Sequence, residues 1–314
     1  MGDPAQECAR MKTWILTLML ASTLTSWADR DLLLVRGAPG NDEFQKKFDA
    51  QAEHWRTAAN HPDLTISEVH KGDEVQTFFK QTKNEGSLWI VFIGHGTYDG
   101  KVAKFNLEGP DLSDADWAEL LKPVEREILL INTSAGSAPF LKTLAGENRI
   151  ILTATRSGFE SSYAYLGEFL ASAFNQLDAD FDKDGRISLL EAFIQASRRV
   201  ADFYEKEERI QTEHALLDDN GDGKGTQGDW FVGVRPDRSK LKQTPPDGYR
   251  ALQVYLAPEK DNGLDDAQRN QRDALERKLF SLRDQKADMD EAAFYEQLEA
   301  LLSELNAFYP AKPD

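Results

Sequence analysis

From Asp31 onward, short apolar runs alternate with amphipathic stretches along the chain. Uninterrupted apolar runs of this length are typical of strands buried on both faces, and amphipathic stretches between them are typical of covering helices. We therefore expect an α/β fold whose doubly wound, mostly parallel sheet has helices on both sides. The strands are expected at residues 32–36, 64–69, 88–93, 128–131 and 150–154, and the helices near 42–59, 74–83, 113–121 and 138–144.

Local signals refine this pattern between the third strand and the third helix. Ser113 stands where the helix should begin, and Asp116 follows at the spacing of a capping box. The residues 101–107 before it have the pattern of a small hairpin. These features predict a short β-element that leads into a capped helix.

The last part of the chain, residues 264–314, is expected to form a helical hairpin. It follows residues 236–263, whose prolines indicate a linker or a long surface loop. Apolar stripes at helical spacing are usually packing surfaces, so we interpret the hairpin as a docking or oligomer-forming appendix. One stripe consists of Leu275, Leu279 and Leu282, and the other of Phe294, Leu298, Leu301, Leu302, Leu305 and Phe308.

The N-terminal residues 1–28 resemble an extension followed by a secretory signal peptide. Residues 11–28 combine one basic residue, a short apolar run and a small residue, which predicts cleavage near Ala28. A membrane-anchored N-terminus is the alternative. Cys8 is the only cysteine, so the mature chain would have none. Export without cysteines favours a bacterial periplasm or the cell exterior, with no membrane span after the signal is removed.

The chain of 314 residues has a formal net charge of −17. A strongly negative field repels nucleic acids and anionic membranes, and it attracts divalent cations. The composition therefore excludes nucleic acid as an expected partner and favours a cation.

Residues 180–191, DFDKDGRISLLE, match an EF-hand calcium loop at every position. Carboxylates alternate at positions 1, 3 and 5, a glycine allows the sharp turn at position 6, and a glutamate closes the loop at position 12. Apolar residues at helical spacing flank the loop, from Leu166 to Leu177 before it and from Phe193 to Phe203 after it. An acidic surface turn is the alternative. The expected ligands are Asp180, Asp182, Asp184, the carbonyl of Arg186, Ser188 through water, and Glu191.

A second acidic loop, residues 218–229, follows the same spacing less closely. Position 8 is Gly225 where an apolar residue is usual, and the short Asp229 stands at position 12. The residues after it, 230–232, favour a strand over a helix. Calcium binding and a turn rich in asparagine and glycine both remain open. The candidate ligands are Asp218, Asn220, Asp222 and Asp229.

A separate candidate site lies at the ends of two expected strands. The third strand leads into His95, which has a glycine on either side, and the fourth ends in Asn132, Thr133 and Ser134. Ligands bind beyond the carboxyl ends of the strands in open parallel sheets. If the two strands are neighbours, His95 faces the hydroxyl pair, and the glycines leave room for an oxyanion-binding N–H.

The segments WIVFIGHGTYDG, EILLINTSAGSAP and TATRSGFESSYAYLGEF resemble those of the caspase and legumain clan of cysteine peptidases, which carry an H-G motif. The resemblance covers residues 88–168 and implies a caspase/legumain-type α/β domain at residues 29–235. It also implies that His95 is the general base and that the N–H of Gly96 forms part of the oxyanion hole. Arg156, Ser161 and Ser162 would line the substrate pocket.

The sequence departs from that clan at the nucleophile. Thr133 or Ser134 stands where the clan has its cysteine, and which of them matches depends on a one-residue shift. Because a hydroxyl is a much weaker nucleophile than a thiol, we expect a non-catalytic domain that binds calcium and a peptide or protein partner. The alternative is an active hydrolase that uses His95 with Ser134 or Thr133.

Overall fold

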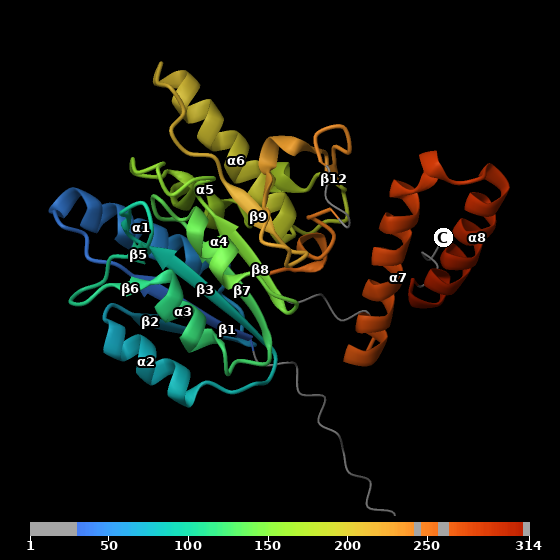
Figure 1. Ribbon diagram of the computed structural model, residues 1–314. Coiled ribbons are helices and arrows are strands. Elements are labelled where there is room, and N and C mark those ends of the chain that lie inside the picture. The colour runs from blue at the N-terminus through green and yellow to red at the C-terminus, as the bar shows by residue number, and fades with distance from the viewer. Residues whose placement is uncertain (1–29, 242–245, 257–263, 310–314) are drawn as a thin grey trace, which may run out of the picture.

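The structure is a computed structural model that describes residues 30–241, 246–256 and 264–309 (Figure 1). The expected extension and signal peptide at residues 1–28 lie outside the described residues, as do parts of the segment 236–263. No helix in the described ranges is long and apolar enough to cross a membrane.

The described core is a seven-stranded mixed sheet with the order β10-β9-β8-β7-β3-β1-β2. Five neighbouring strands run parallel, and β9 and β10 add an antiparallel edge next to β8. The expectation of an α/β fold with a mostly parallel sheet is thus confirmed. The strands are β1 (Arg30–Arg36), β2 (Leu64–Val69), β3 (Ser87–Ile93), β7 (Glu127–Asn132), β8 (Arg149–Thr153), β9 (Leu216–Asp218) and β10 (Thr226–Gln227).

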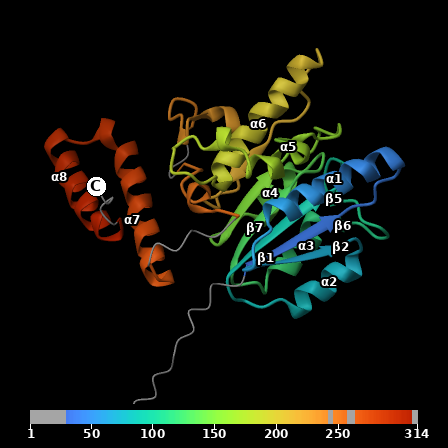
Figure 2. The ribbon, with the colours of Figure 1, turned by 180° about the vertical axis from the view of Figure 1, so that it is seen from behind.

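Helices cover both faces of this sheet (Figures 1 and 2). Within β1, Leu32 and Leu34 face one core, and Leu33 and Val35 face the other. Both faces of the strand are buried, which explains why its sequence is apolar without alternation. The first core includes α1 (Asp42–Ala58), α5 (Leu166–Ala173) and α6 (Leu189–Lys206), and the second includes α2 (Gly72–Gln81), α3 (Asp114–Leu121) and α4 (Ala138–Leu144).

The details between β3 and α3 also follow the sequence. A small antiparallel sheet forms from β4 (Gly96–Tyr98), β5 (Ala103–Phe105) and β6 (Leu112–Ser113), so the expected hairpin extends further on both sides. Ser113 caps α3, and its side chain exchanges hydrogen bonds with Asp116 as a capping box. Local polar residues therefore determined where this helix begins.

The region before residue 180 differs from the expectation. The helix expected to continue to Leu177 ends at Ala173, and a short 3-10 turn, η1 (Leu177–Ala179), follows. Leu177 is 81% exposed, so the last apolar residue of the predicted stripe does not pack in the core. The short turn η1 thus connects the end of α5 to the acidic loop at residues 180–191. After the second acidic loop come η2 (Gly228–Trp230) and a small β-ribbon of β11 (Phe231–Val232) and β12 (Arg235–Pro236).

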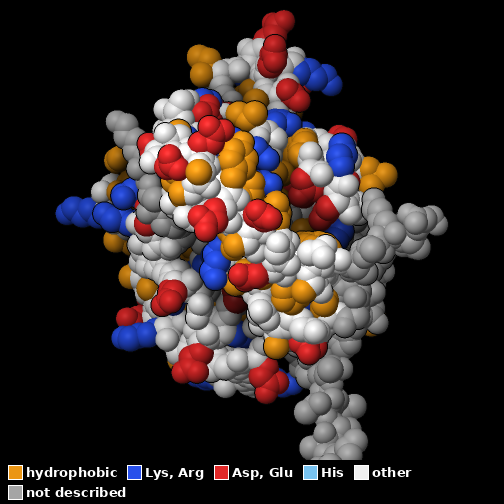
Figure 3. All heavy atoms as spheres, turned by 90° about the vertical axis from the view of Figure 1, so that its right-hand side faces the viewer, with side chains coloured by type: hydrophobic (Ala, Val, Ile, Leu, Met, Phe, Trp, Pro, Cys, Tyr) orange, Lys and Arg blue, Asp and Glu red, His pale blue; other side chains and the backbone are white. Residues whose placement is uncertain are grey.

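At the C-terminal end, α7 (Asp266–Asp284) and α8 (Glu291–Leu305) pack against each other, joined by η4 (Lys286–Asp288) and followed by η5 (Asn306–Phe308). Their shared core contains Leu275, Leu279, Leu305 and Phe308, as the two stripes predicted. Leu302 is an exception because it is exposed. The face in Figure 3 carries many acidic side chains with apolar ones between them.

Candidate functional site

The first acidic loop, residues 180–191, lies between η1 and α6. Ser188 is the N-cap of α6, and Glu191 is the N3 residue of its capping box. The last part of the loop is therefore fixed to the first turn of a long helix. Because this helix is anchored in the main core, it holds the position-12 glutamate in place.

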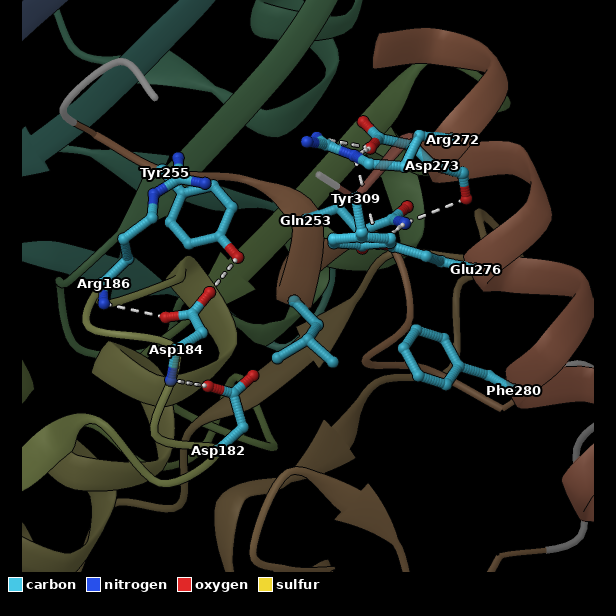
Figure 4. Close-up of a pocket in the computed structure, with 11 residues that line it drawn as sticks. Asp182, Asp184, Arg186, Gln253, Tyr255, Arg272, Asp273, Glu276, Phe280 and Tyr309 are labelled. Carbon is cyan, nitrogen blue, oxygen red and sulfur yellow. Dashed lines mark hydrogen bonds and ion pairs between the residues drawn. The ribbon is translucent and has the colours of Figure 1, made fainter. Parts of the chain in front are cut away.

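Three carboxylates of this loop converge. Oxygen atoms of Asp180, Asp182 and Asp184 all lie within 4.8 Å of one another. Asp180 is only 8% exposed, and its Oδ1 atom is buried without a hydrogen-bond partner. A buried carboxylate oxygen without a partner is costly, so an atom of this kind among other carboxylates fits a cation. Asp182 and Asp184 point toward the neighbouring pocket (Figure 4).

Glu191 closes the loop from the helix side. Its Oε1 accepts the N–H groups of Phe181 and Asp182, and its Oε2 accepts the N–H and hydroxyl of Ser188. Burial raises the pKa of Glu191 above its usual value. Burial also raises the pKa of Asp182, with the negative charges of Asp184 and Asp180 adding to the effect. A bound cation would remove this cost of holding several carboxylates together.

The second acidic loop shares three internal hydrogen bonds with the first and has one more, from the Gly221 N–H to Oδ1 of Asp218 at 2.7 Å. In each loop the position-1 carboxylate accepts the N–H of position 6, position 3 accepts from position 5, and position 5 accepts from position 7. In the first loop these donors are Gly185 (3.2 Å), Asp184 (3.1 Å) and Arg186 (2.7 Å). In the second they are Gly223 (2.8 Å), Asp222 (2.9 Å) and Lys224 (2.8 Å).

The backbone conformations of the two loops agree as well. Position 4 is left-handed in both, with φ of 66° at Lys183 and 79° at Gly221. Position 6 is a left-handed glycine in both, Gly185 at 86° and Gly223 at 73°. Both loops therefore share the left-handed turns at positions 4 and 6.

The loops differ at the closing carboxylate. The side chain of Asp229, at position 12 of the second loop, is 73% exposed and lies 3.9 Å from the Lys240 ammonium. Asp247 instead makes the contacts that Glu191 makes in the first loop. Its Oδ1 accepts the N–H groups of positions 2 and 3, and its Oδ2 accepts the hydroxyl of Thr226 at position 9.

Asp247 is fully buried, and burial raises its pKa to about 8, with the charge of Asp219 adding to the shift. Sequence spacing missed this residue because it comes from the segment that we interpreted as a linker. The only local signal is an Asp-Gly pair after two prolines, which predicts a turn. Nothing in the spacing relates that turn to the loop at residue 218.

His95 is surrounded by aromatic side chains at the carboxyl end of β3. Its ring packs edge-on against Phe44 and Phe48, with centroid distances of 4.5 and 5.2 Å, and it lies near Tyr163. Its Nε2 atom is 3.3 Å from the carbonyl oxygen of Pro39. Burial lowers the pKa of His95, so the ring is held in its neutral form near pH 7.

The two hydroxyls expected opposite His95 bond elsewhere. The Ser134 hydroxyl donates to Oδ1 of Asn132 at 2.6 Å, and Ser134 is only 1% exposed. The Thr133 hydroxyl donates to the carbonyl of Phe92 at 2.6 Å. Strand β4 lies close over this turn, because a Cβ added at Gly96 would be 2.5 Å from the Ser134 hydroxyl oxygen. The hydroxyl of Ser134 thus bonds at the end of its own strand, and the hydroxyl of Thr133 bonds to the neighbouring strand β3.

The expected pocket residues lie on the surface near this turn. Arg156 is exposed and pairs with Glu160 at 3.3 Å, and Ser161 and Ser162 are exposed. Glu160 also contacts the His214 ring at 2.7 Å, and its backbone carbonyl accepts the N–H of Gly136. The segment therefore adjoins the β7 turn that carries Thr133 and Ser134.

No protein-family model matches the chain, and no curated protein sequence matches it.

Proposed function

We propose that this chain is a calcium-binding protein whose α/β domain serves as a binding or scaffold module. The observation that carries the proposal is the buried Oδ1 atom of Asp180, which lacks a protein partner beside the carboxylates of Asp182 and Asp184. A cation in this loop would supply the missing partner and balance the converging charges.

The donor set favours calcium among common cations. Every side-chain ligand that the first loop offers is an oxygen atom, and the loop has the length and spacing of an EF-hand. Zinc prefers nitrogen and sulfur ligands, and magnesium needs a stricter octahedron and usually keeps several waters. The carbonyl of Arg186 and a water at Ser188 would complete the shell with Glu191.

The second loop would bind calcium with a different closing residue. Asp218, Asn220 and Asp222 would occupy positions 1, 3 and 5, and Asp247 would replace Asp229 as the position-12 carboxylate. Support comes from the hydrogen bonds of Asp247, which correspond to those of Glu191. Asp229 would remain a surface residue beside Lys240.

The α/β domain, in this proposal, is a caspase/legumain-like domain that has lost hydrolysis and binds a peptide or protein partner. The hydroxyls of Ser134 and Thr133 support this view because each donates to a group other than His95. A serine or threonine hydrolase needs its base within about 3 Å of the nucleophile. No contact of either hydroxyl favours the alternative of an active hydrolase.

We also propose that the protein is exported, with calcium concentration outside the cytosol setting the occupancy. Extracellular calcium modules typically have dissociation constants of roughly 0.1–1 mM. Calcium at such concentrations would stabilise the loops continuously and would not act as an intracellular signal.

The test is calcium titration of the full chain by calorimetry together with thermal unfolding. With calcium at about 100 times the dissociation constant, bound calcium stabilises a single site by about 2.7 kcal/mol, which raises the melting temperature by roughly 5–10 °C. The variant Asp180→Ala/Glu191→Ala should lose the heat and the stabilisation that belong to the first loop. Asp229→Ala is the matched control and should retain both.

An unchanged calcium response in the double variant would overturn the assignment of the first loop. The scaffold part of the proposal fails on a different result. If the purified protein cleaves a peptide library and the cleavage disappears in His95→Ala, the domain is an active hydrolase.

A further inference from the structure

One segment, residues 246–256, contacts both acidic loops and the C-terminal hairpin; we refer to it as the strap. At its beginning, Asp247 accepts hydrogen bonds from the second loop, as described above. Asp219 of that loop returns the contact, since its carboxylate accepts the N–H groups of Gly248, Arg250 and Ala251 at 3.0, 2.8 and 2.8 Å. The strap and the second loop are therefore joined in both directions.

The end of the strap is attached to the first loop. Ser188 and Tyr255 form an antiparallel β-bridge, and the N–H of Leu189 donates to the carbonyl of Val254 at 2.7 Å. The Tyr255 hydroxyl donates to Oδ2 of Asp184 at 3.2 Å. The guanidinium of Arg186 lies over the Tyr255 ring at 3.4 Å from its centroid. Two expected calcium ligands, Asp184 and Arg186, thus contact one strap residue directly.

The middle of the strap holds the hairpin. The Gln253 side-chain amide donates to the carbonyl of Asp273 at 2.9 Å and to the Glu276 carboxylate at 2.8 Å. The Tyr249 ring stacks on Phe280 with a centroid distance of 5.1 Å, and its hydroxyl donates to Asp284. All of these hairpin residues belong to α7, so the strap is a direct connection from the loops to this helix.

A cavity of about 360 Å³ separates the first loop from α7 (Figure 4). Asp182 and Asp184 line one wall, and Asp273 and Glu276 line the other. Four carboxylates face this space with two guanidinium groups, those of Arg186 and Arg272. Arg272 pairs with Asp273 at 2.8 Å and with Glu276 at 3.9 Å, so the α7 wall is partly neutralised. Each wall still has two carboxylates and one guanidinium. This remaining like charge opposes docking of the hairpin, and a divalent cation on the loop would cancel the negative charge of its wall.

We propose that calcium on the acidic loops governs how firmly the α7–α8 hairpin is held on the α/β domain, and that the strap transmits the effect. The inference rests on the proposed calcium sites. A bound ion orders residues 184–189, which form the bridge to Val254 and Tyr255, and it removes charge opposite Asp273 and Glu276. Both effects favour the docked hairpin, so calcium tightens docking.

Hydrogen exchange of the full chain measures this coupling directly. At about 5 mM calcium, above the usual range of extracellular sites, amides of α7 and of the strap should exchange more slowly than in the presence of a chelator. We expect a change of about ten-fold, within the 5–150-fold range of coupled sites. Helix α2 packs in the second core away from the loops and should not change.

The variant Tyr249→Ala/Gln253→Ala removes the contacts of the strap with α7 described above without altering a proposed calcium ligand. In this variant calcium should still slow exchange at residues 254–256. In α7, however, the exchange rates with calcium and with the chelator should differ by less than about two-fold. Because coupling is reciprocal, the calcium affinity of this variant should be lower than that of the unmodified chain. The decrease should be about the same factor by which calcium no longer slows α7 exchange. Gln297→Ala, on an exposed position of α8, is the matched control and should behave like the unmodified chain.

The outcomes distinguish the two proposals. Calcium heat in calorimetry without any change in α7 exchange would overturn the coupling and leave the calcium sites standing. A full α7 response in Tyr249→Ala/Gln253→Ala would overturn the role of the strap. The absence of calcium heat in the unmodified chain would overturn the calcium sites and the coupling together.

Discussion

The two acidic loops share a backbone path but differ in how they are closed. Both have left-handed residues at positions 4 and 6 and the same three hydrogen bonds from backbone N–H groups to carboxylate or amide oxygens. Glu191 closes the first from within the loop, on the first turn of α6. Asp247 makes the corresponding contacts in the second loop from the strap. A twelve-residue loop can therefore contain its own closing carboxylate or take it from a residue distant in the sequence.

This difference has a physical consequence for assembly. The closing carboxylate of the first loop is three residues from Ser188, so α6 formation brings it into place. The second loop obtains its closing carboxylate only when the strap packs on α6 and pairs with Asp219. The loss of chain entropy for closing the longer connection must be offset by tertiary contacts. We therefore expect calcium binding at the second loop to require the intact domain.

The largest expected effect tests which residue closes the second loop. Asp247→Asn keeps the size of the side chain but removes its charge, so calcium affinity at this loop should fall by more than the roughly 10–100-fold cost of losing an outer-shell partner. Asp229→Asn is the matched control and should change affinity less than about two-fold, because its carboxylate is exposed. Each variant is combined with Asp180→Ala/Glu191→Ala, so that calorimetry measures calcium binding at the second loop alone. The reverse result would restore Asp229 as the ligand.

The next effect concerns Glu213, which lies on the chain between the two loops and contacts neither. Its carboxylate accepts the N–H groups of Tyr165 and Leu166 at the start of α5. Burial raises its pKa to about 7 from 4.5, so the folded state holds the proton more tightly than the unfolded state. This contribution to stability is fully present below pH 4.5 and is lost as the pH rises through about 7.

Glu213→Gln should therefore flatten the decline of unfolding free energy between pH 4.5 and 7.5 in saturating calcium. One pKa unit corresponds to about 1.4 kcal/mol, which gives an upper bound of about 3 kcal/mol for the difference between unmodified and variant chains over this range. Calcium affinities of both loops should stay the same. Parallel pH profiles of the two proteins in urea unfolding would contradict the prediction.

The smallest effects compare position 4 of the two loops. Gly221→Ala places a side chain at positive φ, and its Cβ would lie 2.6 Å from the carbonyl oxygen of Gly146. We expect a loss of about 2 kcal/mol in stability from the strained backbone and this contact. Lys183→Gly relieves a left-handed residue at the exposed equivalent position and should stabilise by less than about 1 kcal/mol. Urea unfolding of both variants measures the two changes in stability, and changes of the same sign would contradict this prediction.

Several elements could be predicted from the sequence because their causes are local. The apolar runs of β1 and β3 predicted buried strands, and Ser113 with Asp116 predicted the start of α3. The helix before the first loop was predicted too long, because Leu177 matched the apolar spacing but is exposed. Periodicity records which residues can share a face; it does not record where tertiary contacts stop the helix.

The candidate sites likewise include one that local spacing predicted and one that depends on tertiary contacts. The spacing of residues 180–191 by itself brought three carboxylates together, since consecutive ligands in a tight loop need no other part of the chain. The hydrogen bond of Thr133 could not be predicted, because its acceptor is Phe92 in the neighbouring strand β3. The acceptor of Ser134 is Asn132, two residues earlier at the end of β7, but the spacing does not show that this side chain turns toward the hydroxyl. Hydroxyl orientation depends on which acceptors the packed sheet places nearby.

The sequence by itself determined the α/β pattern, the acidic charge and the first loop, because each follows from neighbouring residues or from overall composition. Only the tertiary structure decided that Asp247 contacts the second loop, that Tyr255 contacts the first, and that Gln253 holds α7. These contacts join residues that no regular spacing relates, and packing of the strap against the domain brings them within hydrogen-bonding distance.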